Sequence, residues 1–134
     1  YIDHTGIQDI CHRTAVAFFN TDEPIGSYVG CNKALLDSAL QLPKATYGGQ
    51  ELYKTLEEKA AALYYSLTKN HAFENGNKRI AIVTMITFLG INGYRTKFTN
   101  EELSERTIHV AESLPKDRDA LLKDIIKWIQ DHKI

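Results

Sequence analysis

The sequence has few cysteines, little excess charge and no long apolar run. Its two cysteines, Cys11 and Cys31, are spaced neither as a redox dithiol motif nor as a metal-binding pair. The 16 basic residues nearly balance the 17 acidic ones, without the dense basic stripe typical of nucleic-acid binding. The longest apolar run, Ile80 to Ile91, is too short to cross a bilayer. We therefore expect free thiols, no nucleic-acid partner, no membrane association and a cytoplasmic location.

The 134 residues fit one domain, residues 1–134, large enough for a core without disulfide or metal support. Apolar residues recur at helical spacing along most of the chain, which predicts an all-α fold. The predicted helices span about residues 7–19, 32–42, 55–70, 77–91, 100–113 and 117–132.

Helix boundary signals are clear at several points. Thr55 and Thr99 are each followed three residues later by glutamate, as in a capping box. The pair Asn92-Gly93 is typical of a helix end, and Pro43 is expected to close the second helix. The glycine-containing stretch 46–50 is too short and flexible for a helix.

The segment from His71 to Arg79 contains the candidate catalytic and anion-binding residues. A histidine can accept a proton near neutral pH, and Gly76 allows a sharp turn with close approach to a ligand. The apolar helix that follows should begin near Asn77, so its free N–H groups and positive dipole end predict an anion site. Lys78 lies beside Arg79 at this end, where a cation costs about 0.3–1 kcal/mol unless an anion compensates.

The less specific interpretation is that His71 only caps carbonyl groups at a helix end, that Asn77 is a simple N-cap, and that the two cations are solvated. Each residue alone would fit this interpretation. It explains the segment less well, because the base, the glycine and both cations occur together.

This segment resembles the signature of the Fic/Doc superfamily, which reads His-Pro-Phe-x-Asp/Glu-Gly-Asn-Gly-Arg-x-x-Arg in the Fic branch. It is most similar to the death-on-curing (Doc) toxin branch, where lysine replaces the last glycine, here Lys78. The resemblance covers about residues 32–95. It includes Leu35-Leu36-Asp37-Ser38-Ala39-Leu40, Tyr47-Gly48-Gly49, Leu56-Glu57-Glu58-Lys59-Ala60-Ala61-Ala62-Leu63, Lys69-Asn70-His71 and Phe88-Leu89-Gly90-Ile91-Asn92-Gly93-Tyr94.

The resemblance implies a Fic-fold helical domain with a central buried helix after the signature. It also implies a short β-hairpin flap at Tyr47, Gly48 and Gly49 that docks the target protein. A Doc-type domain would transfer the γ-phosphate of ATP to a serine or threonine hydroxyl of a bacterial protein, by resemblance a translation elongation factor, and arrest growth. A cognate antitoxin protein would inhibit it in trans, because the inhibitory Ser/Thr-x-x-x-Glu-Gly/Asn helix of self-inhibited Fic proteins is not recognisable here.

In this scheme the catalytic residues are His71 as general base and Lys78 and Arg79 as phosphate-neutralising cations. The expected cofactors are ATP and Mg²⁺. The nucleotide-binding residues are expected to be Asn75, Gly76, Asn77, Lys78 and Arg79.

Two positions depart from the Fic pattern. Asn75 occupies the acidic position that helps hold magnesium, so this metal ligand is expected to be weak. Ile82 occupies the position of the second arginine, which in Fic proteins engages the γ-phosphate during adenylyl transfer. The alternatives are therefore an AMP or other nucleotidyl transferase, and a degenerate domain that binds a nucleotide or partner without catalysis.

Overall fold

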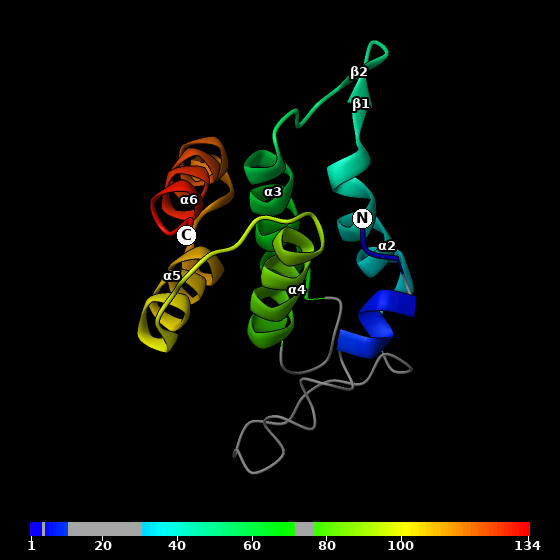
Figure 1. Cartoon of the computed structure of the whole chain (residues 1–134). Helices are drawn as coiled ribbons and strands as arrows, with labels where there is room; N and C mark the ends of the chain where they lie inside the picture. The colour runs from blue at the N-terminus through cyan, green and yellow to red at the C-terminus, as the bar shows by residue number, and fades with distance from the viewer. Residues whose placement is uncertain (4, 11–30, 72–76) are drawn as a thin grey trace.

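The computed structural model describes residues 1–3, 5–10, 31–71 and 77–134, and these residues are mostly helical (Figure 1). Residues 5–10 are helical, and the predicted helix over 7–19 otherwise lies outside the described residues. The remaining elements are α2 (Lys33–Gln41), η1 (Leu42–Lys44), β1 (Thr46–Tyr47), β2 (Gln50–Glu51), α3 (Leu56–Asn70), α4 (Asn77–Ile91), α5 (Asn100–Glu112), η2 (Pro115–Asp117) and α6 (Arg118–Asp131). The all-α prediction with a small hairpin is confirmed.

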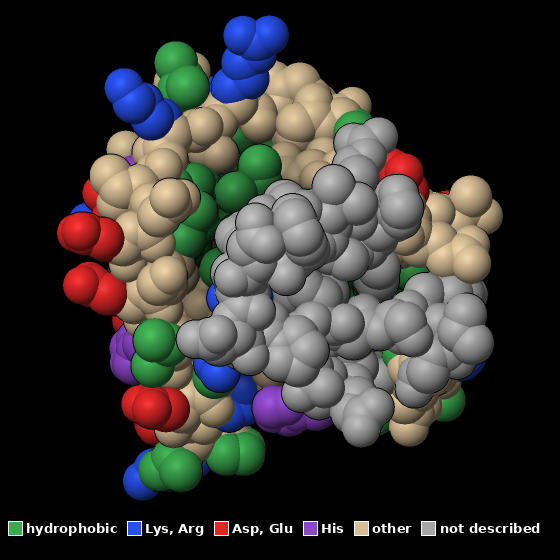
Figure 2. Space-filling model, turned by 90° about the horizontal axis from the view of Figure 1, so that it is seen from below, with side chains coloured by type: hydrophobic (Ala, Val, Ile, Leu, Met, Phe, Trp, Pro, Cys, Tyr) green, Lys and Arg blue, Asp and Glu red, His purple; other side chains and the backbone are tan. Residues whose placement is uncertain are grey.

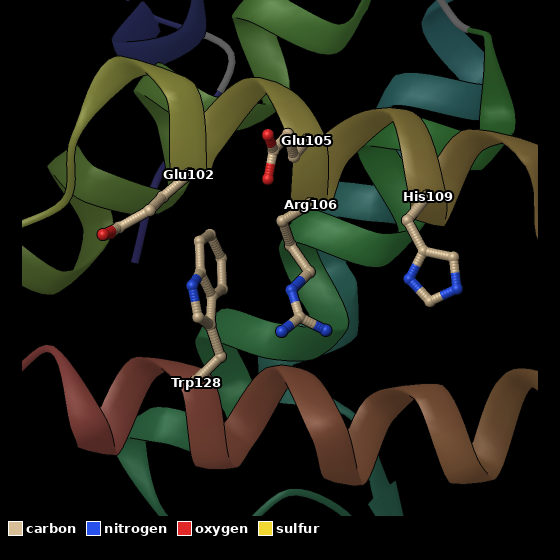
Figure 3. Close-up of a pocket in the computed structure, with 5 residues that line it drawn as sticks. All are labelled: Glu102, Glu105, Arg106, His109 and Trp128. Carbon is tan, nitrogen blue, oxygen red and sulfur yellow. The ribbon is translucent and has the colours of Figure 1, made fainter.

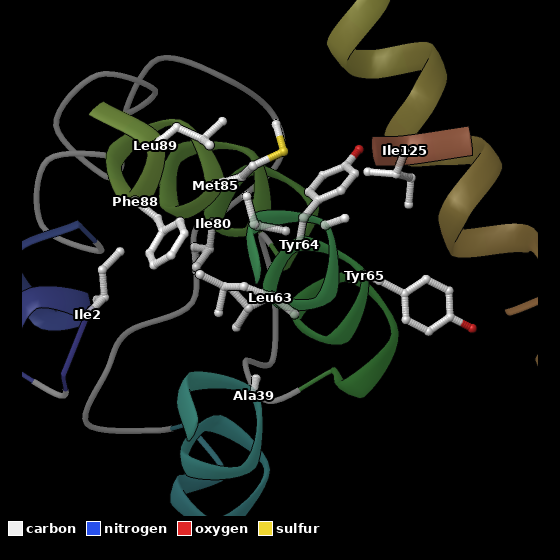
Figure 4. Close-up of a cluster of buried hydrophobic side chains, with 14 of the residues drawn as sticks. Ile2, Ala39, Leu63, Tyr64, Tyr65, Ile80, Met85, Phe88, Leu89 and Ile125 are labelled. Atoms are coloured by element: carbon white, nitrogen blue, oxygen red, sulfur yellow. The ribbon is translucent and has the colours of Figure 1, made fainter. Parts of the chain in front are cut away.

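Helix α3 is the centre of the fold, with packing contacts to α2, α4, α5 and α6. Three consecutive alanines, residues 60–62, are fully buried, and such small side chains let neighbouring helices approach closely. Around α3 the core gathers large side chains from several helices, among them Tyr64, Met85, Phe88 and Ile125 (Figure 4). The Tyr64 hydroxyl forms a buried hydrogen bond with Thr107 of α5, and burial raises its pKa to about 12.

Helix α4 follows the signature, as predicted, and one of its faces is buried in the core. That face carries Ile80, Ala81, Thr84, Met85, Phe88 and Leu89. The opposite side is less covered than an almost wholly apolar run predicts, because Ile86 and Ile91 are 37% and 60% exposed. Among the described residues no helix is long and apolar enough to cross a membrane.

The predicted N-terminal caps are present with one difference between them. At α5 the capping box is complete, since Thr99 accepts from the Glu102 N–H and the Glu102 carboxylate accepts from the Thr99 N–H. At α3 the Thr55 hydroxyl accepts from Glu58 N–H, but the Glu58 carboxylate accepts from Lys54 N–H. Glu58 therefore bonds to the residue before the N-cap, and the capping box at α3 is incomplete.

Two predicted boundaries shift by about one residue. Helix α2 ends at Gln41, and Pro43 lies inside the short turn η1 instead of simply closing the helix. The reason is that proline lacks an N–H but has a φ suited to the first positions of a helical turn. In the same way Pro115 begins η2, so α6 starts at Arg118.

Helix α4 ends at Asn92-Gly93 as predicted. Gly93 N–H donates to Gly90 at 3.0 Å and Tyr94 N–H donates to Leu89 at 2.9 Å, which is the Schellman pattern. Gly93 has φ +76, a left-handed conformation that side chains disfavour.

We expect Gly93→Ala to destabilise the protein by about 1–2 kcal/mol, because a Cβ is disfavoured in the left-handed region. The matched control is Gly90→Ala, in the helical part of the same turn, where an added Cβ meets no atom within 4 Å. Gly90→Ala should raise stability by about 1 kcal/mol or less through helix propensity. Urea unfolding of both variants measures the difference, and equal effects would contradict it.

The chain after α6 is tied to the connection between α4 and α5. Lys97 N–H donates to the His132 carbonyl at 2.8 Å, and Ile134 N–H donates to Arg95 at 3.0 Å. The His132 Nε2 also lies 2.9 Å from the Glu102 carboxylate at the start of α5. These contacts fasten the end of α6 to the beginning of α5.

Candidate functional site

His71 is the first residue after α3, as predicted. It adopts the left-handed conformation, with φ 50 and ψ 45, and its side chain is exposed. A non-glycine residue at positive φ is uncommon, and histidine is among the types that tolerate it best. His71 therefore both ends α3 and stands available to solvent.

Two side chains in the last turn of α3 bond to neighbouring parts of the fold. The Lys69 Nζ donates to the carbonyls of Ser113 at 2.6 Å and Ala111 at 3.2 Å, where α5 ends. A cation is favourable at this negative end of a helix. The Asn70 side chain donates to the Leu35 carbonyl of α2 at 3.3 Å.

Sequence reasoning did not assign these two positioning roles. Lys69 and Asn70 immediately precede His71, so their contacts with α5 and α2 hold the end of α3 at which His71 lies. The sequence feature that could have indicated these roles is the pair of polar residues in the last turn of α3, next to the candidate base His71.

Three of the predicted nucleotide-binding residues lie in the first turn of α4. Asn77 is the first residue of the helix and is half-buried, Lys78 is exposed, and Arg79 is half-buried. Unlike α3 and α5, α4 has no acidic residue in its first turn. The positive end of α4 therefore meets two cations and no carboxylate from its own first turn, which favours an anion there.

The end of α3 and the start of α4 face the same side of the molecule, the lower side in Figure 1. Figure 2 shows this side, where lysine and arginine side chains lie among hydrophobic ones. The predicted nucleotide-binding residues Asn75 and Gly76 lie outside the described residues. Magnesium binding by Asn75 therefore remains a prediction. Within the described ranges there is no group of three or more His, Cys, Asp or Glu side chains placed to hold a metal ion.

Arg79 also lines a cavity of about 280 Å³ between α4 and α5. A second cavity, of about 450 Å³, lies between α5 and α6, and none of the signature residues that the structure describes lines it. There the Arg106 guanidinium lies 5.2 Å from the ring centre of Trp128, and both project into the gap between the helices (Figure 3). Glu102 and Glu105 line the same cavity, so it is poorly suited to an anion.

The predicted flap residues form the tip of the hairpin. Tyr47 pairs with Gln50 across a two-residue turn, in which Gly48 and Gly49 have φ +59 and +82. Positive φ at both positions suits the turn of a tight hairpin. Tyr47 is 83% exposed, and the hairpin projects away from the helices in Figure 1. Target docking by this hairpin stays a prediction.

Comparison with known proteins places the chain in a family. Residues 1–89, about two thirds of the chain, match the sequence model of the Fic/DOC family. Over 59 residues the chain is 52% identical to the protein named Toxin Doc of Mycolicibacterium smegmatis. The match covers 44% of this chain and 45% of that relative, so it spans just under half of the relative's length. The chain belongs to the Fic/DOC family.

Proposed function

We propose that this protein is a Doc-type toxin that transfers the γ-phosphate of ATP to a serine or threonine hydroxyl of a bacterial protein, a translation elongation factor by resemblance. Family membership and the similarity to Toxin Doc support this assignment. The observation that carries it is the arrangement around the signature. An exposed histidine ends α3, and Asn77, Lys78 and Arg79 begin α4.

In the proposed reaction, His71 accepts the proton of the target hydroxyl as its oxygen attacks the γ-phosphorus. The bond between this phosphorus and the bridging oxygen to the β-phosphate breaks, and ADP leaves. Arg79 can bind two phosphate oxygens at once, while Lys78 supplies a mobile point charge. The N–H groups of the first turn of α4 complete the anion site. Magnesium, if held by Asn75 and the phosphates, would neutralise further charge.

The proposal includes a cognate antitoxin protein that neutralises the enzyme by binding the folded domain, and growth arrest when the antitoxin is absent. The similarity to a protein named Toxin Doc supports this partner. Cytoplasmic action follows from the proposed target.

ATP labelled separately at the α- and γ-phosphate tests the reaction, with bacterial lysate as the source of target. The proposal expects protein-bound label from the γ-position alone. Label from the α-position would identify a nucleotidyl transferase. Binding of ATP without transfer of either label would identify a degenerate domain, a possibility that Asn75 raises because an amide is a weaker magnesium ligand than a carboxylate.

Lys78→Gly tests what selects the orientation of the nucleotide, because it introduces the residue of the Fic signature. We expect loss of γ-label transfer and a gain of α-label transfer. Lys78→Arg is the control, since it keeps a cation at this exposed position in the first turn of α4 and should retain γ-label transfer. If Lys78→Gly neither loses γ-label transfer nor gains α-label transfer, another residue selects the orientation.

A further inference from the structure

We propose that the cavity between α4 and α5 holds the nucleoside end of the nucleotide. This inference rests on the proposed function and adds the place and orientation of the substrate. Among the residues that the structure describes, the lining consists of Arg79, Ile82, Val83, Asn100, Leu103 and Ser104.

The cavity is formed by matching faces of the two helices. Helix α4 contributes residues 79, 82 and 83, and helix α5 contributes residues 100, 103 and 104. Both sets follow the spacing i, i+3, i+4 that places side chains on one face of a helix. The cavity is therefore a product of helix packing, with α4 on one side and α5 on the other.

The chemistry of the lining fits a nucleoside. Ile82, Val83 and Leu103 give apolar walls, while the Asn100 amide and the Ser104 hydroxyl provide a few polar groups. Apolar walls with a few polar groups are typical of small-molecule sites. An amide carries both donors and an acceptor, which can meet the polar edge of a base or a ribose hydroxyl.

The size of the cavity indicates that it takes only part of the ligand. Its volume of about 280 Å³ lies at the small end of ligand sites, which run from roughly 300 to 1,000 Å³. The phosphates must then lie outside it. Burying their charges against Ile82 and Val83 would be costly, whereas the cations and the positive dipole end at the start of α4 stabilise them.

Arg79 lies between the proposed phosphate site and the proposed nucleoside site, because it belongs to the first turn of α4 and also lines the cavity. Ile82 and Val83 follow Asn77 by five and six residues, about 7–9 Å along the helix axis. A nucleotide with its nucleoside in the cavity extends its phosphates back toward the start of α4. The γ-phosphate, farthest from the nucleoside, is then the group presented at that end. Ile82 contributes directly, since an apolar wall stands where the Fic signature has an arginine.

The test compares the affinities of ATP and inorganic tripolyphosphate by isothermal titration calorimetry. Wild-type protein should bind ATP about tenfold or more tightly than tripolyphosphate, because ATP also buries the apolar surface of its base against Ile82, Val83 and Leu103. Ser104→Trp places a bulky ring at the cavity on an exposed position of α5, so the fold should be kept. It should lower ATP affinity about tenfold, because the ring fills space that the base would occupy, and leave tripolyphosphate affinity unchanged.

His109→Trp is the matched control, because His109 is an exposed residue of the same helix that lines the cavity between α5 and α6. It should change neither affinity. Ile82→Arg supplies a second test, since a cation in the wall should weaken ATP binding and strengthen tripolyphosphate binding.

Equal affinities of wild-type protein for the two ligands would overturn the inference, as would a Ser104→Trp variant that keeps full ATP affinity or loses both ligands equally. If wild-type protein binds neither ligand, the proposed function fails as well. If the affinities follow the expectation but no γ-label is transferred, the cavity assignment stands and the proposed reaction fails.

Discussion

Replacing His71 is expected to lower the rate of γ-phosphate transfer by about 10²–10⁴, because the attacking hydroxyl loses its general base. Growth inhibition should be lost with it. The measurement is γ-label transfer by purified variants, together with growth of cells that express the variant to the level of the parent.

The conformation of His71 decides which replacement is the best test. Histidine is among the residue types enriched in the left-handed region, so alanine at φ +50 should cost up to about 1 kcal/mol of stability relative to histidine, and reduced activity of His71→Ala could combine two effects. Asparagine tolerates the left-handed region and is not a general base near neutral pH. His71→Asn should therefore unfold at the urea concentration of the parent and still be inactive. Full growth inhibition by a folded His71→Asn variant would refute the role of the histidine.

Arg79→Ala is expected to have the second largest effect, a loss of about 10²–10³ in the rate of transfer, the magnitude seen when a preorganised donor to a developing charge is removed. Arg79 lines the cavity as well as beginning α4, so ATP affinity should fall too. Single-turnover measurements at saturating ATP separate the two effects.

Arg79→Lys is the control for charge. It keeps the cation but removes the planar fork that binds two phosphate oxygens, so it should recover ATP affinity more than rate. A variant Arg79→Lys with the full rate of the parent would show that charge alone suffices. Arg79→Ala with an unchanged rate would remove Arg79 from the reaction.

The sequence was sufficient to predict the elements that local signals define. The two threonine caps, the end of α4 at Asn92-Gly93 and the position of His71 just after α3 all follow from side chains close to the boundary itself. The hairpin was expected from the resemblance to the Fic/Doc superfamily, and the structure gives its local reason, since Gly48 and Gly49 accept the positive φ of a tight turn.

What the sequence could not predict depends on residues far apart in the chain. The Lys69 contact with Ser113 spans 44 residues and exists only because α3 and α5 pack together. The cavity beside Arg79 likewise needs the packing of α5 against α4. The left-handed conformation of His71 was not predicted either, because few non-glycine residues adopt it.

The bonds between residues 95–97 and the end of the chain have a consequence for hydrogen exchange. Chain ends usually exchange their amide protons fastest, since they fray without breaking contacts. Here the Ile134 amide is bonded to Arg95 and the Lys97 amide to His132, so both should exchange slowly. Fast exchange is expected instead at the β1–β2 hairpin, which has two residue pairs and four exposed strand residues. The least protected backbone of the described residues would then be the segment suited to adapt to a protein target.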